Sequence, residues 1–466
     1  MSSIPSPLSG VPSGEASGRI AWIVTALSFG FAVVQLDVTI VNVALPTLAR
    51  DLKASTAALQ WTVDAYTLAF AALLPSAGVI GDRLGARGAY LVGFAVFAVA
   101  SAACGWAPSV AVLIAARGAQ GIGAALLVPT SLALVNRASG EDAGLRAKAV
   151  GFWTAAGGVS IALGPVVGGL LLASVGWRSI FWVNLPVCAV GAGLTLWCVE
   201  RAPGNRQVRG LDLPGQGLAI LCLAGLIGAV IGSRPLGLGH PLVWGGALLA
   251  MAAGALFVTV EARAPAPMLP LSFLTRPNFG PAVLFGVAVN TAYYGVLFVL
   301  SLYLQKALGF SALKTGLAYL PLTGTFILSN IASGWLVARF GSRLPMVLGG
   351  AIGAAGYLLL SRAGGHSGLA DLLPAFALIP AGMGLGVPAM TTAILASVGR
   401  QDTGVASAVL NTARQAGGAV GVAAFGALAD GAQIVWGLHV ATLVSAALVG
   451  AAAALASLAM RPGDQR

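Results

Sequence analysis

The feature that most constrains this chain is a series of apolar stretches separated by short polar or Pro- and Gly-rich segments. Each stretch is about 20 residues long, which as an α-helix matches the hydrocarbon core of a bilayer. Backbone groups find no water there, so a spanning segment must satisfy them within a helix or a closed barrel. The composition agrees, because only 8% of the residues are charged, whereas soluble domains carry about a quarter. The sequence predicts an all-α polytopic membrane protein.

Fourteen of these stretches are expected to form transmembrane helices, bounded by charged residues or by Pro and Gly. The first 18 residues are rich in Ser, Pro and Gly, and we expect them to form a flexible tail. The expected helices cover residues 20–45, 57–80, 89–106, 109–136, 147–173, 178–198, 213–233, 241–260, 280–304, 314–338, 345–361, 371–397, 404–427 and 437–459.

The distribution of basic residues indicates how the chain is oriented. If both termini are cytoplasmic, sixteen of the 25 Lys and Arg residues fall on the cytoplasmic side and seven on the opposite side. Cytoplasmic loops are enriched in Lys and Arg, so we expect cytoplasmic termini. The net charge of +11 does not indicate nucleic-acid binding, because the basic residues are scattered among short loops. Abundant Ala and Gly with little Lys favour a high-GC bacterium, so the expected location is a bacterial inner (plasma) membrane.

The two halves of the chain resemble each other. The segment GVIGDRLGAR at 78–87 aligns without gaps to GWLVARFGSR at 334–343, and GIG at 121–123 recurs as GLG at 384–386. Such a parallel duplication is typical of transporters built from two six-helix bundles. The expected units are a cytoplasmic tail at 1–18, an N-terminal six-helix bundle at 19–200, a linker with two inserted helices at 201–265, a C-terminal six-helix bundle at 266–461 and a cytoplasmic tail at 462–466.

The segment Gly78 to Gly88 concentrates charge in an otherwise apolar region. Its glycines allow a tight turn between two helices whose backbones approach closely. Asp82 is an acid in a loop expected to be basic, so it needs a partner, either a helix N-terminus or an arginine of the neighbouring bundle. Such a contact would form in one conformation and break in the other. The residues assigned to this conformational gate are Gly81, Asp82, Arg83, Gly85 and Arg87.

Residues 81–87, GDRLGAR, are similar to the loop motif between helices 2 and 3 of the major facilitator superfamily. Together with five further stretches they resemble the fourteen-span drug:proton antiporters of that superfamily. The resemblance covers nearly the whole chain. It implies the major facilitator fold, proton-driven export of small amphipathic molecules, a proton-coupling role for Arg117 and an association of Gly164 and Pro165 with antiport. The further stretches are LDVTIVNVALP (36–46), RGAQGIGAA (117–125), GPVVGG (164–169), WRSIFWVNLP (177–186) and NTARQAGGAVGVA (411–423).

Four charged residues, Asp37, Asp64, Arg117 and Arg414, lie well inside expected helices. A charge at mid-span costs roughly 2.5 to 3.5 kcal/mol on insertion scales, so the default expectation is a function. Asp37, Asp64 and Arg117 lie at similar depth, and we expect them to form a proton-coupling cluster. Burial disfavours a charged carboxylate and a nearby arginine favours it, so such a group can load and release a proton. Alternatively, Asp64 caps a helix or pairs with Arg117, and Arg414 either binds an anionic substrate or hydrogen-bonds backbone carbonyls.

Polar and aromatic residues within the spans are candidates for a substrate cavity, because they offer aromatic walls and hydrogen bonds to a lipophilic molecule. Trp61 is equally compatible with an anchor at the membrane interface. The candidates are Asn42, Trp61, Tyr66, Trp153, Asn290, Tyr293, Tyr294, Asn411 and Arg414.

The expected helix at 147–173 carries the segment GGVSIALGPVVGGLL. Its small residues lie on one face, which permits close helix packing, and its proline is expected to bend the axis. A tightly packed, kinked helix would seal the cavity against leakage. We therefore assign Gly164, Pro165 and Gly168 to the conformational gate as well.

The sequence argues against an enzyme, a metal site or an ATP-driven pump. The four cysteines lie in apolar stretches without metal-ligand or disulfide spacing. The spans contain no phosphate-binding loop and no nucleophile–base pair. We expect no cofactor; the expected partners are a small-molecule substrate, protons and the lipid bilayer, with the monomer as the working unit.

The predicted function is proton-coupled export of small amphipathic organic compounds or antibiotics by alternating access, which confers drug resistance. Two alternatives remain. The protein could export one endogenous metabolite, such as a self-made antibiotic, or it could be a membrane sensor that does not transport.

Overall fold

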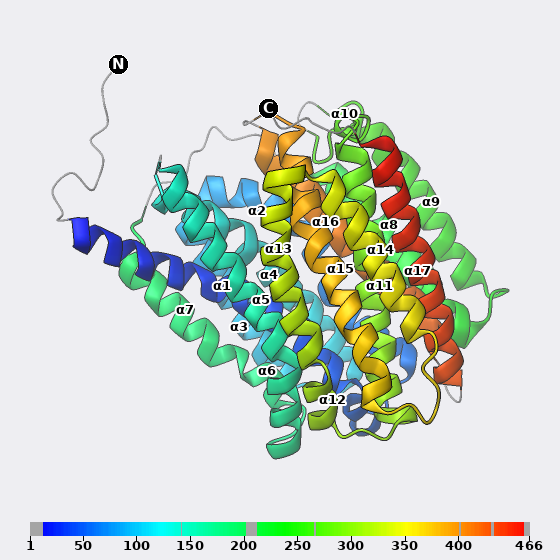
Figure 1. Ribbon diagram of the computed structural model, residues 1–466. Helices are drawn as coiled ribbons and strands as arrows, with labels where there is room; N and C mark the ends of the chain where they lie inside the picture. The colour runs from blue at the N-terminus through cyan, green and yellow to red at the C-terminus, as the bar shows by residue number, and fades with distance from the viewer. Residues whose placement is uncertain are drawn as a thin grey trace.

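The computed structural model describes residues 13–140, 142–201, 212–264, 267–399, 402–429 and 433–460. Throughout these ranges the regular secondary structure is helical (Figure 1), which confirms the expected all-α fold class. The expectation of a flexible tail over the first 18 residues was partly wrong, because the first helix already begins at Ser13. Residues 1–12, 202–211 and 461–466 lie outside the described residues.

The N-terminal bundle is built from the first seven helices. Serine side chains cap two of them: Ser55 accepts a hydrogen bond from the N–H of Ala58 (3.2 Å), and Ser109 accepts one from the N–H of Val112 (3.4 Å). The sixth expected span is divided at Val183 into two helical segments. The helices are α1 (Ser13–Asp51), α2 (Thr56–Leu84), α3 (Ala86–Gly105), α4 (Val110–Ala138), α5 (Ala143–Ser174), α6 (Ser179–Trp182) and α7 (Asn184–Cys198).

Two inserted helices, α8 (Leu213–Leu236) and α9 (Pro241–Glu261), precede the C-terminal bundle. The long helix α11 ends in a π-helical turn, η1 (Tyr303–Ala307), and the span after it is divided into α12 and α13. The C-terminal helices are α10 (Leu271–Leu274), α11 (Phe279–Leu302), α12 (Ala312–Ala318), α13 (Leu320–Phe340), α14 (Arg343–Leu360), α15 (Leu369–Ala396), α16 (Thr403–Leu428) and α17 (Ile434–Ala459).

Thirteen helices of the described chain are long and apolar enough to cross a membrane. The fourteenth expected span corresponds to α16, whose 26 residues are long enough. It does not meet the same standard of apolarity, and it carries Asn411, Arg414 and Gln415. The molecule is therefore a multi-pass membrane protein, and α16 lies where the two bundles meet.

Glycines allow the helices within each bundle to approach closely. Gly168 of α5 faces Ile40 of α1, where an added Cβ would lie 2.9 Å from the Ile40 side chain. In the C-terminal bundle, Gly417 of α16 faces Val287 of α11, with 2.9 Å between an added Cβ and the Val287 carbonyl oxygen. Larger side chains at these glycines would push the helices apart.

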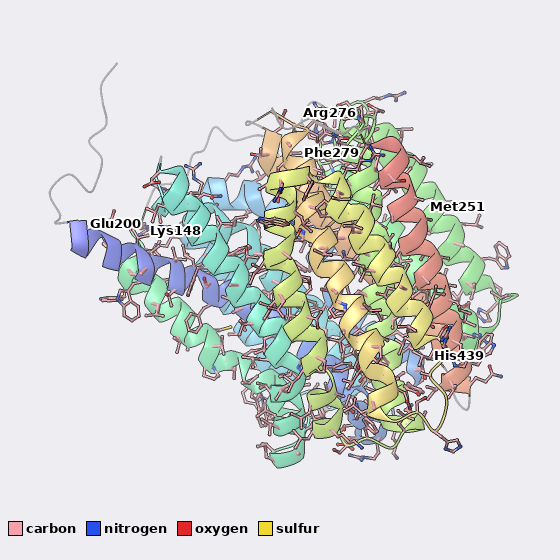
Figure 2. All side chains as sticks on the ribbon, in the orientation of Figure 1. Lys148, Glu200, Met251, Arg276, Phe279 and His439 are labelled. Atoms are coloured by element: carbon pink, nitrogen blue, oxygen red, sulfur yellow. The ribbon has the colours of Figure 1, made fainter. Side chains whose placement is uncertain are left out.

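The inserted hairpin lies against the line along which the bundles meet. Ile227 and Ile231 of α8 form an apolar cluster with Ala419 and Ala423 of α16, and Trp61 of α2 packs on it. Helix α9 packs on α8 and has few buried residues. Figure 2 shows one of its exposed side chains, Met251, at the edge of the molecule.

Alternation of the helices along the chain defines two ends of the molecule. The end with the α1–α2, α5–α6, α11–α12 and α16–α17 connections is called here the distal end, and the opposite end the proximal end. In Figure 2, Lys148, Glu200 and Arg276 lie toward the proximal end, at the top, and His439 lies toward the distal end.

Hydrogen bonds join the two bundles in the distal half. The Gln60 amide of α2 donates to the carbonyl oxygens of Val422 (3.1 Å) and Ala423 (2.6 Å) in α16. The Gln305 amide of η1 donates to the carbonyl oxygen of Val43 in α1 (3.0 Å). Here α5 also packs closely on α12. The described conformation is therefore closed at its distal end.

Candidate functional site

An ion pair lies at the centre of the N-terminal bundle. The guanidinium Nη1 of Arg117 in α4 donates to Oδ2 of Asp37 in α1, and the two side chains are 1% and 0% exposed. The structure therefore brings together two of the three residues expected in the proton-coupling cluster. Two opposite charges in direct contact form a net neutral unit, which reduces the cost of burying them.

Further donors fix the Asp37 carboxylate from other helices. Its Oδ1 accepts hydrogen bonds from the amides of Gln120 (2.7 Å) and Asn184 (2.9 Å). Both amides also donate to the Ser101 hydroxyl, at 2.8 and 3.1 Å. Together these donors hold the carboxylate in one orientation.

Sequence analysis did not assign Gln120, Asn184 or Ser101, although Gln120 and Asn184 stand in quoted stretches. Gln120 follows Arg117 by three residues, so both side chains lie on one helix face, and Arg117 Nη1 donates to Gln120 Oε1 (2.7 Å). A search for polar residues at helical spacing from a charge would have found it. Asn184 comes from a distant helix, and only tertiary structure places it.

The Arg117 side chain is enclosed by α2 and α6. Its Nε donates to the carbonyl oxygen of Thr62 (3.1 Å), and the guanidinium lies 4.3 Å from the centre of the Tyr66 ring. Phe181 lies on another side at 5.9 Å. Tyr66 was expected to line a substrate cavity, and in this conformation it packs over the arginine.

Asp64 is not part of this network. Its side chain is fully buried on α2, and neither carboxylate oxygen has a hydrogen-bond partner among the described residues. It does not pair with Arg117, so the alternative of an Asp64–Arg117 salt bridge is wrong for this conformation. One turn before it, Gln60 contacts α16, which places Asp64 on the side of α2 that faces the C-terminal bundle.

The candidate cavity residues of the N-terminal bundle lie mostly in helix contacts. Trp153 stacks on Phe31 with ring centroids 4.0 Å apart, and its indole N–H donates to Ser131 (3.1 Å). Trp61 packs on α8, so the structure places it at a helix contact. The Asn42 amide donates to the carbonyl oxygen of its own helix at Val38 (3.0 Å).

In the C-terminal bundle, Asn290 and Asn411 donate to carbonyl oxygens of their own helices, at Gly286 (2.8 Å) and Ser407 (3.0 Å). Tyr293 and Tyr294 contact each other edge to face, with centroids 5.3 Å apart. Tyr293 also lines an apolar pocket within the bundle. Its other lining residues are Val296, Leu297, Leu300, Leu322, Tyr357, Leu360, Phe376 and Ile379.

Arg414 is the charged residue inside the C-terminal bundle. It is partly buried in α16, and its stem packs on Gly286 of α11. Its Nε is buried and has no hydrogen-bond partner among the described residues. An arginine with a free buried N–H can donate a hydrogen bond to an anionic or carbonyl oxygen of a ligand, which agrees with its expected role in substrate binding.

The charged motif at 78–88 is mostly helical, which corrects the expectation of a loop. Helix α2 continues through Asp82 and Arg83 to Leu84. The turn is confined to Gly85, whose φ of 81° favours glycine. The side chain of Asp82 lies outside the described residues, so its partner stays a prediction. Gly81 faces Thr130 of α4, with 3.0 Å between an added Cβ and the threonine methyl.

Further residues assigned to the conformational gate lie on α3 and α5. Arg87 Nη2 donates to the carbonyl oxygen of Leu196 in α7 (2.9 Å), so it ties α3 to α7 within one bundle. Gly164 packs against Thr39 of α1, and Pro165 packs against Gly316 of α12. The Gly-Pro motif therefore lies where α5 meets both its own bundle and the opposite one.

The described residues hold no group of three or more His, Cys, Asp or Glu side chains that could bind a metal ion. The four cysteines are free.

Comparison with known proteins places the chain in a family. Residues 27–422 match the Major Facilitator Superfamily, so the protein belongs to this superfamily of membrane transporters. It is 38% identical over 418 residues to the methylenomycin A resistance protein of Streptomyces coelicolor, covering 89% of this chain and 86% of that protein.

Two further relatives are similar over comparable lengths. The multidrug resistance protein Stp of Mycobacterium tuberculosis is 37% identical over 407 residues, which covers 86% of this chain and 74% of the relative. The tetracenomycin C resistance and export protein of Streptomyces glaucescens is 35% identical over 429 residues, which covers 91% of this chain and 78% of the relative.

Proposed function

We propose that this protein is a proton-coupled antiporter that exports small amphipathic organic compounds or antibiotics and so confers drug resistance. Its superfamily and the resistance and export names of its relatives support export. The observation that carries the coupling is the buried ion pair of Asp37 and Arg117 beside the unpartnered carboxyl of Asp64. A purely structural role does not explain three ionisable groups in the core of one bundle, since the charged form of each is costly there.

The surroundings of the two acids divide their roles. Asp37 accepts hydrogen bonds from Arg117, Gln120 and Asn184, so a cation and two amides of its own bundle hold it in place. Asp64 meets no donor and no cation among the described residues, and a buried carboxyl group without a partner costs less when it is neutral. We therefore assign the transported proton to Asp64 in the described conformation and the fixed countercharge to Asp37.

Alternating access follows from the position of Asp64 on the side of α2 that faces α16. Opening of the distal end requires the bonds from Gln60 to α16 and from Gln305 to α1 to break. Breaking them exposes this side of α2 to water, where a carboxyl group exchanges its proton. A membrane potential supplies about 2.3 kcal/mol per charge per 100 mV, which can drive export of a substrate against its gradient.

In the proposed orientation the protein lies in a bacterial inner membrane, and both termini and the proximal end face the cytoplasm. All fourteen long helical segments are then spans. The described conformation is then closed to the outside. Trp335 and Arg339 at the proximal end of α13 are typical of such an interface.

Export of a single compound is the second candidate. Its support is that two of the three relatives described above are named for one antibiotic each. The two functions share one mechanism and differ only in the breadth of the substrate site.

The test uses energised inside-out vesicles and a fluorescent pH dye. Lipophilic cations, neutral antibiotics and anions are added one at a time. Proton release by several compounds, lost in Asp37→Asn and Asp64→Asn at unchanged protein level, supports a multidrug antiporter. Release by one compound alone supports the dedicated exporter. A fully active Asp64→Asn variant would refute the assignment of the proton.

A further inference from the structure

The base of the inserted hairpin holds two carboxyl groups that the mechanism above does not use. Asp212 precedes α8, and its Oδ1 accepts a hydrogen bond from the N–H of Gly215 (2.9 Å). Glu261 ends α9, and its Oε2 accepts one from the N–H of Leu269 (3.0 Å), in the segment that leads into the C-terminal bundle. Each carboxyl group has one oxygen in use, and both lie at the proximal end.

The second oxygen of each group points to the same place. Oδ2 of Asp212 and Oε1 of Glu261 lie 2.5 and 2.7 Å from the position that a Cβ atom on Gly215 would take. Both oxygens are buried, and neither meets a donor among the described residues. The Glu261 residue is 3% exposed. Two acceptor oxygens that face each other away from water are stable only if a proton or a cation lies between them.

A proton fits this place better than a metal ion. Hard cations take six or more oxygen ligands, and here two carboxylate oxygens converge. The other groups that face Glu261 are the backbone N–H groups of Leu269 and Met268, which do not ligate a cation. Gln216, next to Gly215 in the chain, faces α2, where its Oε1 accepts a hydrogen bond from the neutral Ser76 hydroxyl (2.6 Å). Arg263, two residues after Glu261, is exposed.

We propose that Asp212 and Glu261 share one proton and form a second protonated site, separate from the Asp37 and Asp64 centre. The shared proton ties the start of α8 to the end of α9 and, through Leu269, to the segment before the C-terminal bundle. Loss of the proton places two negative charges side by side and loosens this junction. Gly215 is required because any side chain would occupy the space in which the two oxygens meet.

Infrared spectroscopy of the purified full-length protein tests the proposal. The carbonyl stretch of a protonated carboxylic acid should lose intensity in Glu261→Gln. Asp64→Asn should remove a different component of the same band, so the two sites are told apart. The matched control is Glu200→Gln, because Glu200 is exposed and ion-paired with Arg19, and this substitution should leave the acid band unchanged. An unchanged acid band in Glu261→Gln would overturn the proposal.

Thermal unfolding gives an independent readout. The folded state holds the shared proton more tightly than the unfolded state does, so the wild-type unfolding temperature should fall as the pH rises. In Glu261→Gln the amide donates to Asp212 at every pH, so this part of the slope should disappear. If that variant does not fold, Asp212→Asn serves instead, because its amide can donate to Glu261 while its oxygen still caps α8. Equal slopes for wild type and variant would overturn the proposal.

Discussion

The two bundles share a fold but differ in what they bury. The N-terminal bundle encloses Asp37, Asp64 and Arg117, and several polar side chains hold the first and last of these in place. The C-terminal bundle encloses an apolar pocket lined by residues such as Tyr357 and Phe376, with Arg414 as its one charge well inside a helix. A duplicated framework has thus placed the buried acids on one side and apolar packing on the other. The difference predicts that substitutions in the two bundles have different effects.

The largest effect is expected for Arg117→Ala. It leaves Asp37 buried without its cation, and removal of one partner of a buried ion pair typically costs 3–5 kcal/mol. We expect loss of substrate-triggered proton release and a lower yield of folded protein, measured with the pH dye and by size-exclusion chromatography. Arg414→Ala is the matched variant in the other bundle and should keep proton release for neutral substrates. The reverse outcome would end the proposed division of roles.

The next comparison separates the two acids. Asp64→Asn replaces a carboxyl group that we propose to be neutral and that has no hydrogen-bond partner among the described residues, so the unfolding temperature should stay near that of wild type. Asp37→Asn removes the negative partner of Arg117 and should lower it. Both substitutions should abolish coupled export. Differential scanning fluorimetry measures the unfolding temperatures, and the vesicle assay measures export. Stability lost in Asp64→Asn and kept in Asp37→Asn would mean that the charge states are assigned the wrong way round.

A smaller effect is expected in the C-terminal pocket. Phe376→Leu removes an aromatic wall, and an aromatic contact is worth about 0.5 to 1.5 kcal/mol beyond the area it buries. The cavity is about 10 Å³, too small to hold a substrate, so the substitution should lower the unfolding temperature and leave the substrate KM and the maximal rate of proton release unchanged. Leu358→Ala is the control, because Leu358 is half exposed on α14. A raised KM in Phe376→Leu with an unchanged unfolding temperature would contradict this packing role.

The smallest effect concerns the contact between the bundles. Gln60→Ala removes two hydrogen bonds to α16, each worth about 0.5 to 1.5 kcal/mol net. The population open at the distal end should increase. Spin labels at Lys53 and Lys306, in a variant without native cysteines, report the separation of the bundles there. Asn330→Ala is the control, because that amide bonds only within α13. Identical distance distributions would show that Gln60 does not hold the distal end closed.

The apolar periodicity was sufficient to predict the helices, because a spanning segment must be both long and apolar. It failed at the charged motif, where the glycines and charges of residues 81–84 indicated a loop but the backbone stays helical until Gly85. The first helix was also longer than its apolar core, because polar residues can extend a helix beyond the membrane. Helix α16 was predicted although its polar residues weaken the apolar pattern.

The charged residues of the site could be selected from the sequence, because charge within a span is rare. Their partners could not be assigned in the same way. The depth of Asp37, Asp64 and Arg117 is similar, but whether a side chain faces its own bundle or the opposite one depends on helix rotation. For this reason Asp37 pairs with Arg117 and Asp64 does not. Asn184 reaches Asp37 from 147 residues away, and only the packing of α7 against α1 reveals it.

The inserted helix α8 makes the two side walls of the transporter unequal toward the lipid. On one wall the contact between α2 and α16 is overlaid by α8, through Ile227 and Ile231 and through the bond from Ser76 to Gln216. On the other wall α5 and α13 meet directly and run side by side (Figure 1). A lipophilic compound in the bilayer would thus meet a single helix layer at α5 and α13, and an additional layer at α2 and α16.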